Sequence, residues 1–314
     1  MKKFIITIDT EGDNIWTWDG KSAIRTENAL YISRFQELCE RYGFIPTYLV
    51  NWEMAHDDRF VDYIKPKVKE RKCEVGMHLH PWNTPPFYDL PRDQTSGLPY
   101  LIEYPIDIME EKINRITQLI ELKFELKPLS HRAGRWAMNA EYFSQLYKYG
   151  YTTDCSYTPG MSWVRHRGRT PGIGGSDYSG EKNVITRYNG IYEVPLSTMV
   201  THKLFNQAYK DKIDYEQRKR VLWLRPDNKN LKQIKYLIRS RRDSKIDYLE
   251  FMLHSSELMP GGSPTFRSIN DIEMLYRQLD IIFNEIETYY SGIGLAEYIQ
   301  EKMTLNNKTY RNNG

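Results

Sequence analysis

Two histidines separated by one residue are the clearest chemical signal in the sequence. His78 and His80 stand in the segment EVGMHLHPW, whose apolar start favours a β-strand. Side chains two residues apart on a strand project to the same side, so the two imidazoles are placed to bind one metal ion. A pair of structural histidines is the alternative that this motif alone leaves open.

Three carboxylates follow the first apolar run with the same spacing. The run is Lys3–Asp9, and Asp9, Glu11 and Asp13 come at its end. If the chain stays extended, the three face one side, where they repel each other unless a cation or an arginine compensates. One carboxylate would complete a set of two histidines and one carboxylate, which is a common ligand set for Zn²⁺ or Fe²⁺. An acidic turn after a strand is the alternative.

Other apolar runs also end in residues that can do chemistry. Arg132 and Arg135 flank Gly134, Asp154 ends a later run, and His254 precedes a loop rich in Gly and Pro. An arginine at a strand end can hold a carboxylate in its ionised form. A histidine in such a position is a candidate general acid. Surface charge and a structural histidine are the corresponding alternatives.

A sheet must bring these side chains together. Strands are predicted at Lys3–Asp9, Ile45–Val50, Glu74–Met77, Lys127–Arg132, Tyr151–Ser156, Ile191–Pro195 and Tyr248–His254. Helices are predicted around 32–42, at Asp58–Lys69, Ile106–Leu122 and Ala140–Tyr149, and from Ser268 onward. This alternation favours an α/β fold with a parallel sheet, and at this length a barrel over an open sheet. In both architectures the carboxyl ends of the strands carry function.

The order of these motifs resembles that of the polysaccharide deacetylase family, also called carbohydrate esterase family four. The matching segments run from Thr7 to about Pro264. The resemblance implies a single-domain, distorted (β/α)7 barrel over residues 1–303. Loop insertions are expected at about 81–104 and 158–245, followed by a polar tail at 304–314. It also implies one divalent metal ion, commonly zinc.

The resemblance assigns ligands to that metal. His78 and His80 match the two ligand histidines, and Glu11 matches the ligand carboxylate. The family usually has two adjacent aspartates in its first motif, whereas Thr10 separates the acids here, so Asp13 is a rival ligand. The family's histidines are usually four residues apart, and these are two apart.

The resemblance also assigns catalytic roles. Asp9 matches the catalytic base and Arg132 matches the arginine that orients it. His254 matches the general acid, and Asp154 matches the carboxylate partner of that histidine.

The implied activity is that of a hydrolase acting on non-peptide C–N bonds. The substrate would be an N-acetylated sugar or glycan intermediate of bacterial surface-polysaccharide assembly. The chemistry of the site does not specify the acyl group, so hydrolysis of another amide or ester bond is one alternative. The altered motif spacing keeps an inactive carbohydrate-binding protein as another.

The composition restricts the other classes of function. The 314 residues include 44 Lys and Arg and 41 Asp and Glu, a net charge of +3, which argues against a dedicated nucleic-acid binder. No run of 18 apolar residues predicts a membrane-spanning helix. The apolar stretch near the N-terminus ends at Ile8, too short for a signal-peptide core, so we expect a cytoplasmic protein.

The segment Lys210–Lys245 is locally basic, with 13 basic and 5 acidic residues. It predicts contact with an anion, such as a phosphate- or nucleotide-linked sugar or a membrane surface. A solvated helix face is the alternative. Trp163 and Trp223 are candidates for stacking on sugars, or else for the core.

Overall fold

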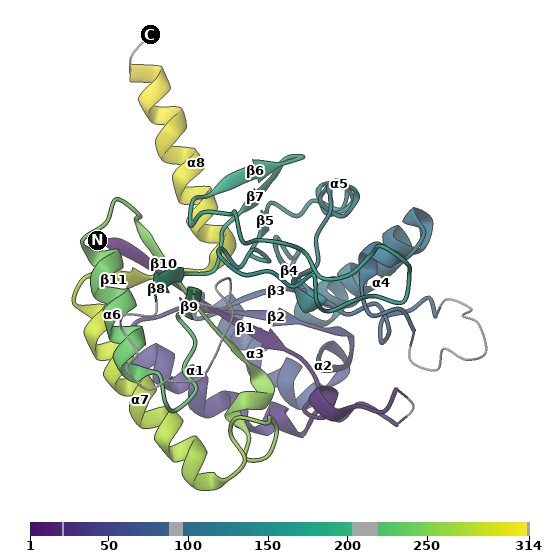
Figure 1. The fold of residues 1–314 in the computed structure, drawn as a ribbon, viewed down its shortest axis with the longest axis horizontal. Coiled ribbons are helices and arrows are strands. Elements are labelled where there is room, and N and C mark those ends of the chain that lie inside the picture. The colour runs from purple at the N-terminus through teal and green to yellow at the C-terminus, as the bar shows by residue number, and fades with distance from the viewer. Residues whose placement is uncertain (21, 88–96, 203–218, 313–314) are drawn as a thin grey trace.

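A curled, mostly parallel sheet organises the chain (Figure 1). The structure is a computed structural model, and it describes residues 1–20, 22–87, 97–202 and 219–312. Seven parallel strands follow in the order β10-β1-β2-β3-β4-β5-β7. Their bounds are β1 (Lys2–Thr10), β2 (Pro46–Val50), β3 (Glu74–Leu79), β4 (Ser130–Ala133), β5 (Thr153–Asp154), β7 (Ile191–Glu193) and β10 (Tyr248–His254). The distorted barrel expected from the sequence is confirmed.

Two further strands join this sheet, and two others form a separate two-stranded sheet. They are β6 (Thr186–Tyr188), antiparallel to β7; β11 (Tyr290–Gly292), parallel to β1; and the antiparallel pair β8 (Thr198–His202) and β9 (Lys219–Trp223). The helices are α1 (Ile32–Arg41), α2 (Trp52–His56), α3 (Asp58–Lys69), α4 (Ile106–Phe124), α5 (Ala140–Lys148), α6 (Leu231–Arg242), α7 (Ile269–Glu287) and α8 (Leu295–Asn312). None of the described helices is long and apolar enough to cross a membrane.

The barrel closes without a continuous strand ladder between β7 and β10. The Glu250 N–H donates to Ser197 Oγ at 2.9 Å, and the Ser197 N–H donates to the Glu250 carbonyl at 3.3 Å. The Met252 N–H reaches the Leu224 carbonyl at 3.3 Å. The expected loop insertion 158–245 is therefore part of the barrel itself, because it contains the sheet strand β7 and the residues that bridge β7 to β10.

The barrel interior contains both an apolar and a polar group of residues. Ile5, Leu49 and Cys155 form an apolar cluster with Leu295 and Tyr298 of α8. Other buried residues of the strands are polar, among them Thr7, Asp9, His78, Arg132 and Glu250. Asp9, His78 and His254 stand at or near the carboxyl ends of β1, β3 and β10.

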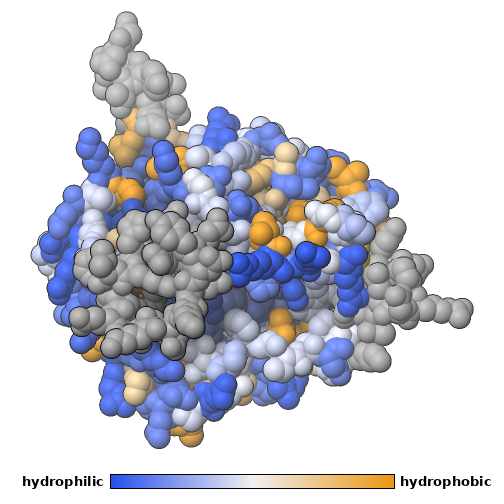
Figure 2. Space-filling model, in the orientation of Figure 1, coloured by the Kyte–Doolittle hydropathy of each residue, from blue (hydrophilic) through white to orange (hydrophobic). Residues whose placement is uncertain are grey.

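The C-terminal segment differs from the expectation. Residues 304–312, expected to be a polar tail, continue α8 instead. The start of α8 is held in the barrel cluster, and its far end projects from the body (Figure 1). On the visible face of the molecule, hydrophobic residues appear as scattered spots among hydrophilic ones (Figure 2).

An aromatic cluster joins α7 to the outer face of the sheet. The Phe283 ring lies 5.2 Å from Phe44, 5.8 Å from Phe4 and 5.9 Å from Phe251, measured between centroids. All four side chains are buried. Edge-to-face contacts of this kind add to the free energy gained by burial.

We predict that Phe283→Ala lowers the free energy of unfolding by about 3–5 kcal/mol, because it leaves a cavity inside this cluster. Urea denaturation measures the change. Ile281→Ala on the same helix is the matched control, because Ile281 is 43% exposed and its truncation should cost less than about 0.5 kcal/mol. Equal losses in the two variants would contradict the packing described.

Candidate active site and metal centre

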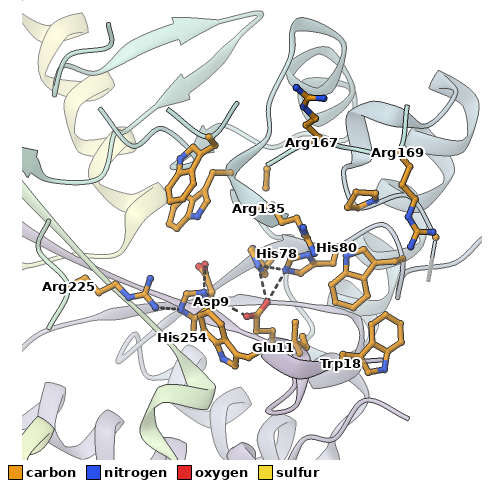
Figure 3. A pocket seen from close by; sticks show the side chains of 18 of the residues that line it. Asp9, Glu11, Trp18, His78, His80, Arg135, Arg167, Arg169, Arg225 and His254 are labelled. Atoms are coloured by element: carbon orange, nitrogen blue, oxygen red, sulfur yellow. Dashed lines mark hydrogen bonds and ion pairs between the residues drawn. The ribbon is translucent and has the colours of Figure 1, made fainter. Parts of the chain in front are cut away.

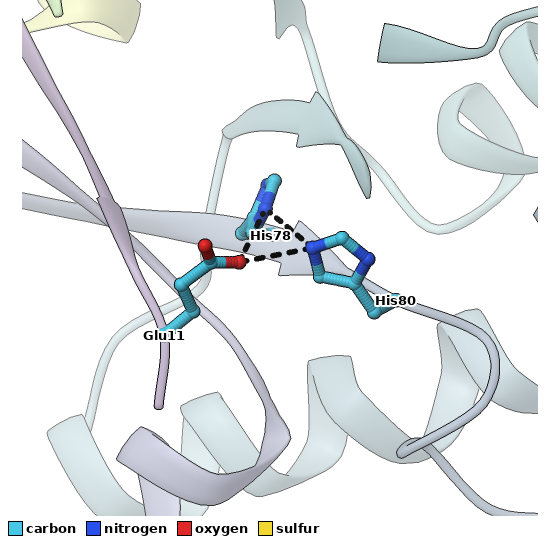
Figure 4. Close-up of side chains that lie close together, drawn as sticks. All are labelled: Glu11, His78 and His80. Atoms are coloured by element: carbon cyan, nitrogen blue, oxygen red, sulfur yellow. Dashed lines mark hydrogen bonds and ion pairs between the residues drawn. The ribbon is translucent and has the colours of Figure 1, made fainter. Parts of the chain in front are cut away.

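Three buried side chains turn their ligand atoms toward one point (Figure 4). Glu11 Oε2 lies 2.9 Å from His80 Nε2 and 3.3 Å from His78 Nε2, and the two Nε2 atoms are 3.1 Å apart. Zinc–ligand bonds of about 2.0–2.1 Å at tetrahedral angles separate neighbouring ligand atoms by about 3.3 Å. The group therefore has the donor types and the spacing of three ligands of one metal ion.

Hydrogen bonding at His78 supports this use. The His78 Nδ1–H donates to the Arg132 carbonyl at 2.9 Å, which leaves the lone pair on Nε2, the atom that faces Glu11 and His80. His80 Nδ1 is buried and has no partner among the described residues. A Cβ at Gly134 would lie 2.6 Å from that atom, so glycine is what lets the turn after β4 approach the His80 ring.

The backbone of Glu11 is fixed by residues that the sequence reasoning missed. The Glu11 N–H donates to Ser255 Oγ at 3.1 Å, and Asn28 Nδ2 donates to the Glu11 carbonyl at 2.7 Å. Burial acts to raise the pKa of the Glu11 carboxyl, but the adjacent His78 and His80 rings outweigh it and hold that pKa well below its usual range. Glu11 is thus a carboxylate at neutral pH, as a metal ligand must be.

Asp13 does not join this group. The strand ends at Thr10, and the chain turns at Gly12, where a Cβ would meet the Arg25 carbonyl at 2.7 Å. The Asp13 carboxylate instead accepts the Glu27 N–H at 2.7 Å and Arg25 Nε at 3.2 Å. Its expected alignment with Asp9 and Glu11 is wrong, because the chain does not stay extended.

Asp9 and Arg132 form a buried ion pair beside the ligand group. Arg132 Nη1 donates to Asp9 Oδ1 at 2.6 Å, and Nη2 donates to Glu250 Oε1 at 2.6 Å and to Thr7 Oγ1 at 2.7 Å. Burial acts to raise the pKa of Asp9, but the Arg132 guanidinium reverses the effect and lowers that pKa. Asp9 is held as a carboxylate whose Oδ2 faces His254.

His254 stands across from Asp9, in the register that pairs β1 with β10. Its Nε2 is 3.7 Å from Asp9 Oδ2 and 3.8 Å from Glu11 Oε1. Its Nδ1 is 3.2 Å from Glu257 Oε2 and 3.1 Å from Arg225 Nη2. One edge of the ring therefore points toward Asp9 and Glu11, and the other edge meets a carboxylate and a guanidinium.

The expected pairing of Asp154 with His254 is wrong. Asp154 Oδ1 lies 2.6 Å from His131 Nδ1 and accepts Ser156 Oγ–H at 2.9 Å. Its neighbour Cys155 packs inside the barrel, and side chains alternate along a strand, so Asp154 faces outward. Glu257 takes the predicted place of Asp154, three residues after His254, a spacing that sequence reasoning could have used.

The loop that follows His80 is held by a buried lysine. Lys112 Nζ, on α4, donates to the carbonyls of Pro81 at 2.8 Å and Pro86 at 2.6 Å, and also to that of Thr84. Lys112 is 1% exposed. Burial lowers the pKa of Lys112 to about 7, and its contacts with three carbonyls fix the segment that follows the second histidine.

The site opens into a cavity of about 620 Å³. Six of the seven tryptophans of the chain line it: Trp16, Trp18, Trp82, Trp136, Trp163 and Trp223. Trp18 stacks on Trp82 with ring centroids 4.9 Å apart, and Trp82 lies against the His80 ring. Trp163 and Trp223 thus belong to the cavity wall. Aromatic faces are suited to the apolar faces of sugar rings.

The fold resembles that of several solved structures. One is assigned as a polysaccharide deacetylase from Mycobacterium smegmatis, with a TM-score of 0.51 and 11% identity over 98% of this chain and 92% of that one. Another is assigned as a glycoside hydrolase/deacetylase from Parabacteroides distasonis, with a TM-score of 0.57 and 9% identity over 94% and 70% of the two chains. A 4-alpha-glucanotransferase from Thermococcus litoralis gives a TM-score of 0.54 and 14% identity over 95% of this chain and 40% of its own.

These likenesses establish the fold, which is a divergent form of the polysaccharide deacetylase barrel. No family model matches the chain, and no curated protein matches it in sequence. The resemblance predicted from the ordered motifs is confirmed at the level of the fold.

We predict that the purified protein binds one divalent metal ion, and that His78→Ala, His80→Ala and Glu11→Gln each lose most of it. Asp13→Asn should keep the metal, because Asp13 points to Arg25 and Glu27. Elemental analysis after incubation with zinc gives the stoichiometry. His56→Ala, at an exposed histidine, is the matched control. A wild type that takes up no metal would refute the assignment.

We predict that Glu257→Gln lowers stability at neutral pH. Burial acts to raise the pKa of Glu257, but Arg225 and His254 reduce it to about 2. A depressed carboxyl pKa stabilises the fold above the unfolded value of about 4.5, and that gain is lost as pH falls toward 2. The variant should lose up to about 3 kcal/mol at pH 7 and differ less at pH 3.

Urea denaturation at the two pH values measures this difference. Glu287→Gln, at an exposed carboxyl, is the control and should leave stability unchanged at both. A Glu257→Gln deficit that stays constant down to pH 3 would show that Glu257 is not ionised in the folded state.

Proposed function

We propose that the protein is a metal-dependent carbohydrate deacetylase. The observation that carries the proposal is the convergence of Glu11, His78 and His80 beside the Asp9–Arg132 pair, at the mouth of a deacetylase-type barrel. The cavity above them is walled by tryptophans, which supports a sugar or glycan as the substrate. The sequence resemblance supports an N-acetylated intermediate of surface-glycan assembly in particular.

In this proposal the residues around the metal position have separate roles. Glu11, His78 and His80 would hold a divalent metal ion, which when bound would polarise an acyl carbonyl and lower the pKa of water toward 7. Asp9 Oδ2 is free of Arg132 and accepts the proton of the attacking water. Arg132 keeps Asp9 anionic and fixes its orientation through Oδ1. In this proposal Glu11, His78 and His80 bind the metal, whereas Asp9 accepts the proton of the water.

His254 is placed to protonate the leaving amine. Its Nε2 faces the same space as Asp9 Oδ2, 3.7 Å away, so both groups reach one reacting centre. On the other edge of the ring, Nδ1 contacts Glu257 Oε2 and Arg225 Nη2, and these two contacts fix the orientation of the imidazole.

We predict that the wild type releases acetate from N-acetylated sugars, and that Asp9→Asn lowers kcat by about 10²–10⁴ while keeping the metal. The test is a coupled acetate assay on chitooligosaccharides, N-acetylglucosamine 1-phosphate and uridine diphosphate N-acetylglucosamine, with and without added zinc. Asp62→Asn, at an exposed carboxyl, is the control.

Two outcomes would revise the proposal. If Asp9→Asn loses metal in proportion to activity, Asp9 is a ligand and not the base. If metal-loaded protein binds these sugars but releases neither acetate nor another acyl group, the chain is a binding protein on the deacetylase fold.

A further inference from the structure

Four arginines line the cavity, and two of them have no carboxylate partner among the described residues. Arg225 pairs with Glu257 at 2.9 Å. Arg135 and Arg167 form no ion pair with any described residue, and Arg169 stands on the same loop as Arg167. Figure 3 shows Arg135, Arg167 and Arg169 on the side of the two ligand histidines that lies away from Arg225 and His254.

The carboxylates of the cavity do not neutralise this group. Asp9 is paired with Arg132, and the Glu11 carboxylate is turned toward the two histidines. Guanidinium groups that line the same concave wall attract an anion more strongly than an isolated guanidinium does in open water. A bound metal would add positive charge to the same cavity.

A buried glutamate fixes the loop that carries Arg167 and Arg169. Glu103 Oε1 accepts the N–H groups of Arg169 at 2.6 Å and Thr170 at 2.8 Å. Gly168 permits the contact, because a Cβ there would lie 2.3 Å from that oxygen. Glu103 is 8% exposed, so the loop is anchored to the protein interior. The two arginines are therefore presented from a held loop.

Arg135 is presented by a backbone conformation that disfavours ordinary side chains. Arg135 and Trp136 have φ values of +56° and +62°, in the left-handed region. Two consecutive residues other than glycine in this region are strained, and such strain gathers at functional sites. The turn directs both side chains into the cavity wall, and the Arg135 guanidinium lies 5.8 Å from the Tyr100 ring centroid.

Two arginines of the segment Lys210–Lys245, which is expected to contact an anion, have partners within the protein. Arg241 on α6 donates to the Thr198 carbonyl, and Arg242 pairs with Asp243 at 2.8 Å. Residues 210–218 of the basic segment lie outside the described residues. Within the described part of that segment, Trp223 and Arg225 are the ones that line the cavity.

We infer that Arg135 and Arg167 form an oxyanion-binding subsite, so that the substrate is an acidic sugar whose phosphate or carboxylate is bound there. The inference rests on the proposed function for the reaction, but the subsite itself is a statement about binding. Guanidinium forks suit both oxyanions, because each presents paired oxygens. The acyl group would then be placed at the ligand cluster by a contact remote from the reacting atoms.

Equilibrium binding tests the subsite. N-acetylglucosamine 1-phosphate and N-acetylmuramic acid carry the two oxyanions, and N-acetylglucosamine is the neutral probe. Calorimetry on the protein as purified should show tighter binding of at least one acidic sugar, weakened by salt. Arg167→Gln and Arg135→Gln should each raise its Kd about tenfold or more, and change that of the neutral sugar less than about twofold.

Arg165→Gln is the matched control, because Arg165 is exposed on the same loop and is not among the described residues that line the cavity. Since Arg135 stands at a strained turn, Arg167→Gln carries the test if Arg135→Gln does not fold. Equal affinity for acidic and neutral sugars would overturn the inference. So would an unchanged Kd in Arg167→Gln, or inorganic phosphate that binds as tightly as the sugar phosphate with the same dependence on arginine.

Kinetics separate this inference from the proposed function. If acetate is released, Arg167→Gln should raise KM for the acidic substrate and leave kcat unchanged, because a remote contact contributes uniform binding. Acetate release with the same KM for acidic and neutral sugars would refute the subsite and keep the deacetylase. Arginine-dependent binding of acidic sugars with no hydrolysis would keep the subsite and refute the deacetylase.

Discussion

The buried guanidinium of Arg132 links both halves of the site. It is fully enclosed, and it donates to Asp9, to Glu250 and to the Cys155 carbonyl. Removing such a charge from water costs several kcal/mol, which is offset only when its donors are satisfied. The Arg132 carbonyl also accepts the Nδ1–H of His78. One residue thus orients the proposed base through its side chain and sets the tautomer of a proposed metal ligand through its backbone, so the site depends on the register of β4.

Two carboxyl groups accept hydrogen bonds from Arg132, but they differ in their ionisation. Burial raises the pKa of Glu250 to about 8, although Arg132 opposes the shift. At neutral pH Glu250 is therefore largely protonated, and the positive charge of Arg132 is compensated mainly by Asp9. The negative charge therefore lies on Asp9, whose Oδ2 is not bonded to Arg132 and is available to accept a proton. A polar barrel interior serves this arrangement, whereas an apolar one would leave the ion pair without its further hydrogen bonds.

Much of the architecture follows from local sequence. The alternation of apolar strands with amphipathic helices predicted the parallel barrel, and β10 spans the predicted Tyr248–His254. The pair His78 and His80 was recognisable because alternate residues of a strand share a face, whereas Glu11 was singled out among three acidic residues only by the family resemblance. What failed was the assumption of continued extension: Asp13 was placed with Glu11 by spacing alone, and the turn at Gly12 carries it to Arg25.

The sequence by itself determined which residue types stand at the strand ends, since hydrophobic periodicity is a local property of the chain. The tertiary structure decided which of them meet. Asp154 ends a strand as predicted, yet it faces the outside of the barrel and pairs with His131, while Glu257 from a short turn reaches His254. The grouping of tryptophans and arginines in one cavity was equally hidden, because it depends on loops far apart in the chain. Contacts between distant segments are set by packing and register, which no local pattern encodes.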